Sequence, residues 1–186
     1  MPKRGIVCGV GLNDSDYTVK SKNGKCPFYI KWSQMINRCY SKRFHLLRPT
    51  YKDCTVCDEW LIFSNFKTWM VLQDWKGKVL DKDILEQGNK VYSPSTCIFV
   101  TTRINNLLGT HTTSRGEYPQ GVYKDKLNNK YKAQCSVDGK YVHIGRYGTV
   151  EEAYSAYKKF KYNVIADVAS TQEEPLKSAL LNYKIT

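Results

Sequence analysis

Long apolar runs are missing from this chain of 186 residues. No segment approaches the roughly 18 consecutive apolar residues that span a bilayer. The basic first segment, MPKRGIVCGVGLNDSDY, lacks the apolar core of a secretory signal. The sequence therefore predicts no membrane association, and we expect a cytoplasmic protein. An apolar content of 41% and an aromatic content of 13% are sufficient for one ordinary domain or two small ones.

A regular cysteine framework is also missing. The seven cysteines form an odd set at irregular intervals, which favours reduced thiols over disulfides. The single CxxC pair, Cys54 and Cys57, would need Cys39 and Cys97 to complete the four thiolates of a structural zinc site. Because only one CxxC is present, we interpret these cysteines as core residues and do not expect structural zinc.

Acidic residues are scarce. The chain has 17 acidic and 29 basic residues, a formal net charge of +12. The excess is concentrated in two segments: residues 1–70 carry 12 basic and 5 acidic side chains, and residues 121–162 carry 9 and 4. Lys and Arg that neutralise phosphates release condensed counterions, so this balance favours a polyphosphate partner. A merely solubilising surface is the alternative.

The N-terminal part of the chain predicts two amphipathic helices followed by short extended segments. Residues 26–42 place apolar side chains at steps of three and four, and residues 58–73 do the same with Asp58 and Glu59 in the first turn. The two apolar faces contain Tyr29, Trp32, Met35, Ile36 and Cys39, and Trp60, Phe63, Phe66, Trp69 and Met70. Residues 78–93 predict a hairpin that turns at Gly88-Asn89 and ends before Pro94. Residues 95–109 predict a helix start and a short helix that ends at Gly109.

The C-terminal part predicts a three-stranded antiparallel sheet packed on one helix. Asn128-Asn129 and Asp138-Gly139 are hairpin dipeptides between extended segments. Thr149 and Glu152 form a capping box that starts an amphipathic helix. A polar segment rich in Gly, Thr and Ser precedes this part and is expected to be a linker.

Residues 121–169 resemble the plant ethylene-response-factor (APETALA-type) DNA-binding domain, in the version found in bacteriophage and homing endonucleases. The pieces GVY, KYKAQ and GKYVHIGRYGTVEEAYSAY carry the resemblance. It implies that the sheet enters the DNA major groove, where Lys and Arg neutralise phosphates or bond guanine and Gln bonds adenine. The implied DNA-binding residues are Tyr123, Lys124, Lys126, Lys130, Tyr131, Lys132, Gln134, Lys140, His143 and Arg146.

Residues 5–108 resemble phage proteins classed as HNH endonucleases, through the pieces VCDEW, LDKD and YSPSTC and the later Asn105. Such a site needs a histidine base, an orienting asparagine and ligands for one divalent cation. The resemblance implies Asp81 and Asn105 as ligands of Mg²⁺ or Mn²⁺, with Lys82 at the position of the base and Thr96 at that of the orienting asparagine. A lysine between Asp81 and Asp83 should stay protonated and make a poor base.

We therefore expect an α+β chain with two domains: an HNH-like ββα domain with additional helices in residues 1–109, a linker in residues 110–116, and a DNA-binding domain in residues 117–186. The expected function is binding of double-stranded DNA in a phage-infected host cytoplasm, with weak metal-dependent cleavage attached. The alternative is a catalytically retired scaffold that binds a host protein.

Overall fold

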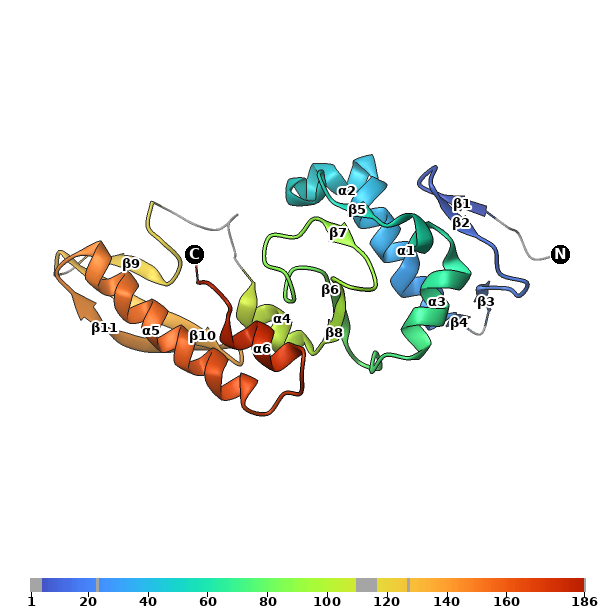
Figure 1. The fold of residues 1–186 in the computed structure, drawn as a ribbon. Coiled ribbons are helices and arrows are strands. Elements are labelled where there is room, and N and C mark those ends of the chain that lie inside the picture. Colours follow the sequence, from blue (N-terminus) through green and yellow to red (C-terminus); the bar gives the residue numbers. More distant parts are fainter. Residues whose placement is uncertain (1–4, 23, 110–116, 127, 186) are drawn as a thin grey trace. The chain divides into compact units, whose positions relative to one another are not determined.

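The computed structural model describes residues 5–22, 24–109, 117–126 and 128–185 of a mixed α and β chain (Figure 1). The expected linker, residues 110–116, lies outside the described residues. The chain divides into two compact units, Met1–Val100 (unit 1) and Thr101–Thr186 (unit 2). The positions of these units relative to one another are not determined. Within the described residues, none of the helices combines the length and apolar character of a membrane span.

Unit 1 is built from short strands around three α-helices and two 3₁₀ turns. Its strands are β1 (Gly5–Val7), β2 (Gly11–Asn13), β3 (Lys20–Ser21), β4 (Gly24–Lys25), β5 (Thr55–Val56), β6 (Val79–Asp81), β7 (Val91–Tyr92) and β8 (Ile98–Val100). Its helices are α1 (Pro27–Tyr40), α2 (Lys42–Leu47) and α3 (Phe63–Val71), and its 3₁₀ turns are η1 (Pro49–Tyr51) and η2 (Asp58–Leu61).

Helix α1 supplies the centre of the core of unit 1. Proline occupies its first turn, where no backbone donor is needed. The five side chains expected on its apolar face are all buried: Tyr29, Trp32, Met35, Ile36 and Cys39. The indole Nε1–H of Trp32 donates to the carbonyl of Trp60 at 2.7 Å. The first predicted helix is confirmed.

The second predicted helix is interrupted. Residues Asp58–Leu61 form the 3₁₀ turn η2, and α3 starts only at Phe63. Ile62 between them is extended and forms a parallel bridge with Leu12 of β2. Pairing with a strand from elsewhere in unit 1 therefore breaks a helix that the apolar spacing alone would continue.

The predicted hairpin across Gly88-Asn89 is wrong. Strand β6 pairs antiparallel with β8, and β7 pairs in parallel with β5. A Gly-Asn dipeptide lacks the Asn-Gly order favoured in two-residue hairpins. Instead, the amide of Asn89 donates to the carbonyls of Lys82 and Val91 at 2.8 and 2.7 Å. The side chain of Asn89 thus closes residues 82–91 into a loop.

The helix start predicted in residues 95–100 is also wrong, whereas the short helix after it is confirmed. Residues Ile98–Val100 form β8, as β-branched and aromatic side chains favour. Helix α4 (Thr102–Leu108) starts after Thr101, whose side chain accepts a bond from the backbone of Ile104. Strands β6, β7 and β8 precede α4 along the chain, and α4 belongs to unit 2.

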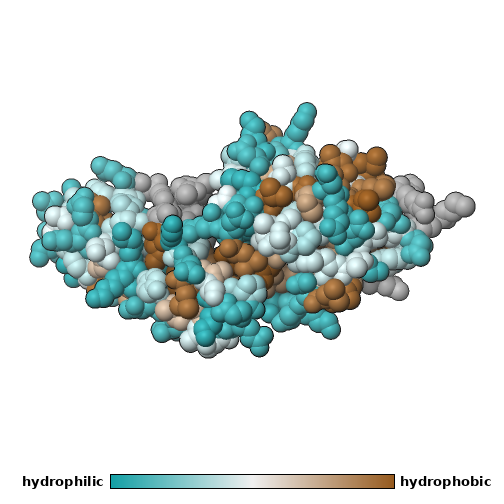
Figure 2. All heavy atoms as spheres, viewed as in Figure 1, coloured by the Kyte–Doolittle hydropathy of each residue, from teal (hydrophilic) through white to brown (hydrophobic). Residues whose placement is uncertain are grey.

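Unit 2 contains the predicted sheet and helix. Besides α4, its elements are β9 (Val122–Asp125), β10 (Lys130–Val137), β11 (Lys140–Tyr147), α5 (Val150–Ala169) and α6 (Leu176–Leu181). The strands form one antiparallel sheet in the order β11-β10-β9, and α5 packs along it (Figure 1). Thr149 and Glu152 make both bonds of the capping box. The hydroxyl of Tyr183 bonds the carbonyl of Leu108 at 2.9 Å, which joins α4 to the C-terminal segment. Figure 2 shows hydrophilic residues over most of the α5 side of this unit.

Gly121 provides a test of this packing. Its φ is +82°, and a Cβ at this position would collide with the buried ring of Tyr157. Gly139 has a similar φ of +78° but open space around it. Both alanine variants carry the backbone strain, and only Gly121→Ala adds overpacking. We expect Gly121→Ala to lower the free energy of unfolding of unit 2 by about 1–2 kcal/mol more than Gly139→Ala does, as measured by urea denaturation. Equal losses would contradict the described contact.

Candidate nucleic-acid interface

The two faces of the β9–β11 sheet differ in chemistry. The side chains of Val122, Ala133 and Cys135 are buried in the core with Ala153 and Tyr157 of α5. Because side chains alternate along a strand, the intervening residues face away from α5. On this open face Lys132 pairs with Tyr123 on one side and Arg146 on the other, and Gln134 pairs with His143.

A β-bulge keeps the two cross-strand pairs on the same face. The register shifts between Ala133 and Gln134, so that Ile144 is the extra residue on β11. Ile144 packs against the core, while His143 and Arg146 lie opposite Gln134 and Lys132. Without the extra residue, strict alternation would turn one of the pairs toward α5.

Asp125 anchors the basic part of the open face. Its side chain is only 3% exposed, and its Oδ2 lies 3.0 Å from Nε of Arg146 and 3.2 Å from Nζ of Lys132. Both basic side chains keep part of their surface in solvent, at 50% and 34%. Charge-assisted bonds to a buried carboxylate fix the direction of the two cations. The cluster of Asp125, Lys132 and Arg146 carries a net charge of one positive unit.

The other sequence-predicted residues lie on the strands of this sheet and in its loops. Tyr123, Lys130 and His143 are exposed strand residues, and Lys124, Lys126 and Lys140 are exposed at other positions of the sheet and its loops. Tyr131 differs, because it is partly buried against the core, with its ring 5.5 Å from that of Tyr118. It is thus a packing residue in this arrangement. Sequence reasoning missed Asp125, since an acidic residue in a basic strand gives no sign of its burial.

Lys82, predicted at the base position of an HNH site, is buried in unit 1 with 5% of its surface exposed. Its Nζ donates to Oδ1 of Asp83 at 2.5 Å and to the carbonyl of Asn89 at 2.6 Å. Burial by itself lowers the pKa of Lys82, but the bond to Asp83 and its charge outweigh this, so the pKa is raised. The side chain of Lys82 is therefore protonated at neutral pH, as the sequence predicts for a lysine between two aspartates.

Asp81 and Thr96 also take part in loop structure. Oδ1 of Asp81 accepts the backbone N–H groups of Asp83 and Ile84 at 2.7 and 2.9 Å. Burial raises the pKa of Asp81. The hydroxyl of Thr96 donates to the carbonyl of Val91 at 2.8 Å. Both side chains thus stabilise the segment between β6 and β8, a role that local sequence signals did not indicate.

The predicted cation ligands are not brought together within one unit. Asp81 ends β6 in unit 1, whereas Asn105 lies in α4 of unit 2. Among the described residues, no group of three or more His, Cys, Asp or Glu side chains is arranged to hold a metal ion. Burial raises the pKa of the Cys39 and Cys97 thiols to about 12, so both are neutral at neutral pH. Asp81 is the one predicted ligand that unit 1 contributes.

Comparisons of this chain with protein-family models, with curated proteins and with solved structures find no match.

Proposed function

We propose that this protein binds double-stranded DNA through the open face of the β9–β11 sheet. The anchoring of Lys132 and Arg146 on buried Asp125, within a partly exposed face, is the observation that carries the proposal. Lys130, Gln134 and His143 surround the cluster with further groups that bond phosphates or base edges. The resemblance to the ethylene-response-factor type of domain points to the same face.

Binding of the full-length chain to a fluorescent duplex, followed by anisotropy at several salt concentrations, tests this proposal. Phosphate contacts predict that the logarithm of the association constant falls linearly with the logarithm of salt, by about 0.9 for each neutralised phosphate. If a duplex does not bind, and a host protein is captured with an affinity that survives high salt, the alternative of a host-factor binding protein is favoured instead.

We infer that unit 1 serves mainly as a scaffold with at most slow strand cleavage. The ammonium of Lys82 is held in an ion pair and cannot accept a proton from water at neutral pH. Loss of a general base typically removes about 10²–10⁴ in rate. Asp81 is the predicted ligand that unit 1 would offer to Mg²⁺ or Mn²⁺, which would supply charge stabilisation to the departing phosphate oxygen.

Supercoiled plasmid gives the test of this inference. With pure protein and Mg²⁺ or Mn²⁺, we expect at most slow formation of nicked circles, and none with Asp81→Ala. Asp74→Ala, which removes an exposed carboxylate elsewhere in unit 1, is the matched control and should leave the nicking rate unchanged. Efficient nicking by the wild type at neutral pH in Mg²⁺, lost in Lys82→Ala that still folds, would show that Lys82 is catalytic.

A further inference from the structure

The positive charge of residues 1–70 lies outside the β9–β11 sheet. These residues carry 12 basic and 5 acidic side chains. Four of the basic residues lie within residues 42–52, which contain α2 and η1 and no acidic residue, and Asp53 follows directly. Figure 1 shows α2 at the edge of unit 1. This local concentration of charge is typical of a surface that contacts a polyanion.

Two adjacent leucines at the end of α2 are exposed to solvent. Leu46 is 83% exposed and Leu47 is 73% exposed, and Leu46 is the most exposed large apolar residue of the described chain. Phe44 of the same helix packs differently, with its ring 5.5 Å from that of Tyr51 in an edge-to-face contact. The two leucines therefore project from unit 1 beside a fixed aromatic pair.

The backbone that carries the leucines is held at both ends. The side chain of Ser41 accepts the backbone N–H of Phe44 at 3.3 Å, and the backbone N–H of Arg48 donates to the carbonyl of Phe44 at 2.9 Å. Nε2 of His45 lies 2.9 Å from the carbonyl oxygen of Arg38, which ties α2 to α1. Because this segment is already ordered, contact with a partner costs less conformational entropy.

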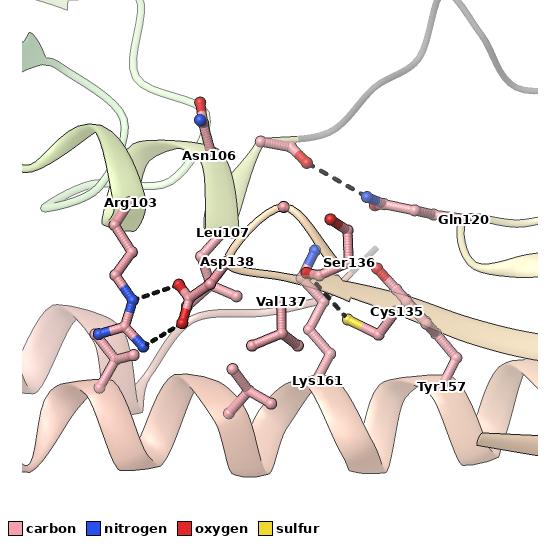
Figure 3. Close-up of a pocket in the computed structure, with 14 residues that line it drawn as sticks. Arg103, Asn106, Leu107, Gln120, Cys135, Ser136, Val137, Asp138, Tyr157 and Lys161 are labelled. Atoms are coloured by element: carbon pink, nitrogen blue, oxygen red, sulfur yellow. Dashed lines mark hydrogen bonds and ion pairs between the residues drawn. The ribbon is translucent and has the colours of Figure 1, made fainter. Parts of the chain in front are cut away.

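The cations beside the leucines are available to phosphates. All four are exposed: Lys42, Arg43, Arg48 and Lys52. Within the part of the chain that the structure describes, none of them forms an ion pair. Arg103 of unit 2 differs, because Asp138 holds it through two bonds of 2.5 and 3.0 Å (Figure 3). The charge of α2 and η1 is therefore free to neutralise a polyanion.

A small apolar tip between cations matches the minor groove of duplex DNA. Proteins that bend DNA insert leucine and similar side chains between base steps from this groove, with Arg and Lys around them. Two leucines cover a small part of the roughly 800 Å² that each partner buries in a typical protein complex. Helix α2 has six residues, whereas many helices that lie on membranes have roughly 20–30.

We propose that Leu46 and Leu47 form a wedge that enters a duplex from the minor groove and separates two base pairs, with the cations of residues 42–52 on the flanking phosphates. The wedge rests on the proposed binding of double-stranded DNA, to which it adds a contact by unit 1. Burial of the leucines and loss of base stacking are similar in size and opposite in sign. The wedge should therefore change the shape of the duplex more than the affinity.

A duplex of about 30 bp with several TA steps is the probe, because these steps unstack easily. The adenine of each step is replaced by 2-aminopurine, whose emission rises when the base loses its stacking partner. EDTA prevents metal-dependent cleavage during the measurement. With the full-length protein, we expect the emission to rise at least about twofold at saturation.

Leu46→Gln with Leu47→Gln should remove most of this rise, while the affinity measured by anisotropy changes less than about threefold. Leu46→Met with Leu47→Met should keep the rise, because methionine is also an apolar wedge. Val71→Gln with Leu72→Gln is the matched control. It changes another adjacent apolar pair of unit 1, at 54% and 80% exposure, and should keep the full rise.

Duplex binding without a rise in emission, or an equal rise in both glutamine variants, would overturn the wedge and leave DNA binding by the sheet face standing. A rise that depends on Leu46 and Leu47, in a protein whose affinity survives Lys130→Gln with Lys132→Gln, would instead support the wedge and contradict the sheet site. Failure to bind any duplex would overturn both proposals. Binding to phosphatidylserine vesicles that requires the two leucines, without a change in 2-aminopurine emission, would assign them to a membrane surface and overturn the wedge.

Discussion

Replacement of Asp125 by asparagine is expected to weaken duplex DNA binding about tenfold, although it makes the protein more positive by one charge. The carboxylate is buried and fixes Arg146 and Lys132 at 3.0 and 3.2 Å. Asparagine keeps an oxygen acceptor but loses the charge that orients the two cations. Loss of the orientation of the two cations therefore predicts weaker DNA binding by this variant, whereas long-range attraction predicts tighter binding.

Asp138→Asn is the matched control for Asp125→Asn. It makes the same change in charge and also releases an arginine, because Asp138 pairs with Arg103 through an exposed ion pair. Attraction alone predicts that both variants bind duplex DNA slightly more tightly than the wild type. The positioning role requires weaker binding by Asp125→Asn only, in a protein shown by thermal melting to be folded at the assay temperature. Tighter binding by both variants would refute it.

Lys82→Ala is expected to lower the free energy of unfolding of unit 1 by about 2–3 kcal/mol. The substitution removes a buried ammonium and leaves the carbonyl of Asn89 without that donor. Lys78→Ala breaks an ion pair of the same 2.5 Å length, between Lys78 and Asp74, at a more exposed place. Lys78→Ala should lower the free energy of unfolding by less than about 0.5 kcal/mol. Urea denaturation of the two variants measures the difference, and similar losses would contradict the loop-stabilising role of Lys82.

The contribution of Lys82 also has a defined pH dependence. Its pKa in the folded chain is raised above the ordinary value of 10.5. The folded state therefore holds the proton more tightly, and the stabilisation is complete below pH 10.5 and is lost as the pH rises through the folded value. The stability difference between wild type and Lys82→Met should stay constant from pH 7 to about 9.5 and decrease at higher pH. A difference that already falls near neutral pH would indicate another titrating group.

Local signals explain why so much of unit 2 could be predicted. The turns between its strands lie at the dipeptides Asn128-Asn129 and Asp138-Gly139. The φ angles of Asn129, Asp138 and Gly139 are positive, as such turns require. The capping box starts α5 at the expected residue. These features depend on neighbours within a few residues, so the sequence alone contains them.

Unit 1 depends more on contacts between distant segments. Strands β5 and β7 have two residues each and form a parallel pair, so neither has a strong local signal. The ion pair of Lys82 depends on the loop that Asn89 closes. The same limit applies to Asp125, because its ion pairs are with side chains on two other strands. The sequence was sufficient to select candidate residues, but it could not predict how deeply they are buried or which partners they bond.

Duplex binding by two variants of equal net charge tests the central proposal most directly. Lys130→Gln with Lys132→Gln removes two cations from the open sheet face, and Lys158→Gln with Lys159→Gln removes two exposed cations from α5. Measured by anisotropy with the full-length chain, the sheet variant should bind about tenfold or more weakly than wild type, and its salt slope should fall by about 1.8. The α5 variant should change less than about threefold. Equal losses in both variants, or wild-type binding by the sheet variant, would contradict the assignment of DNA binding to this face.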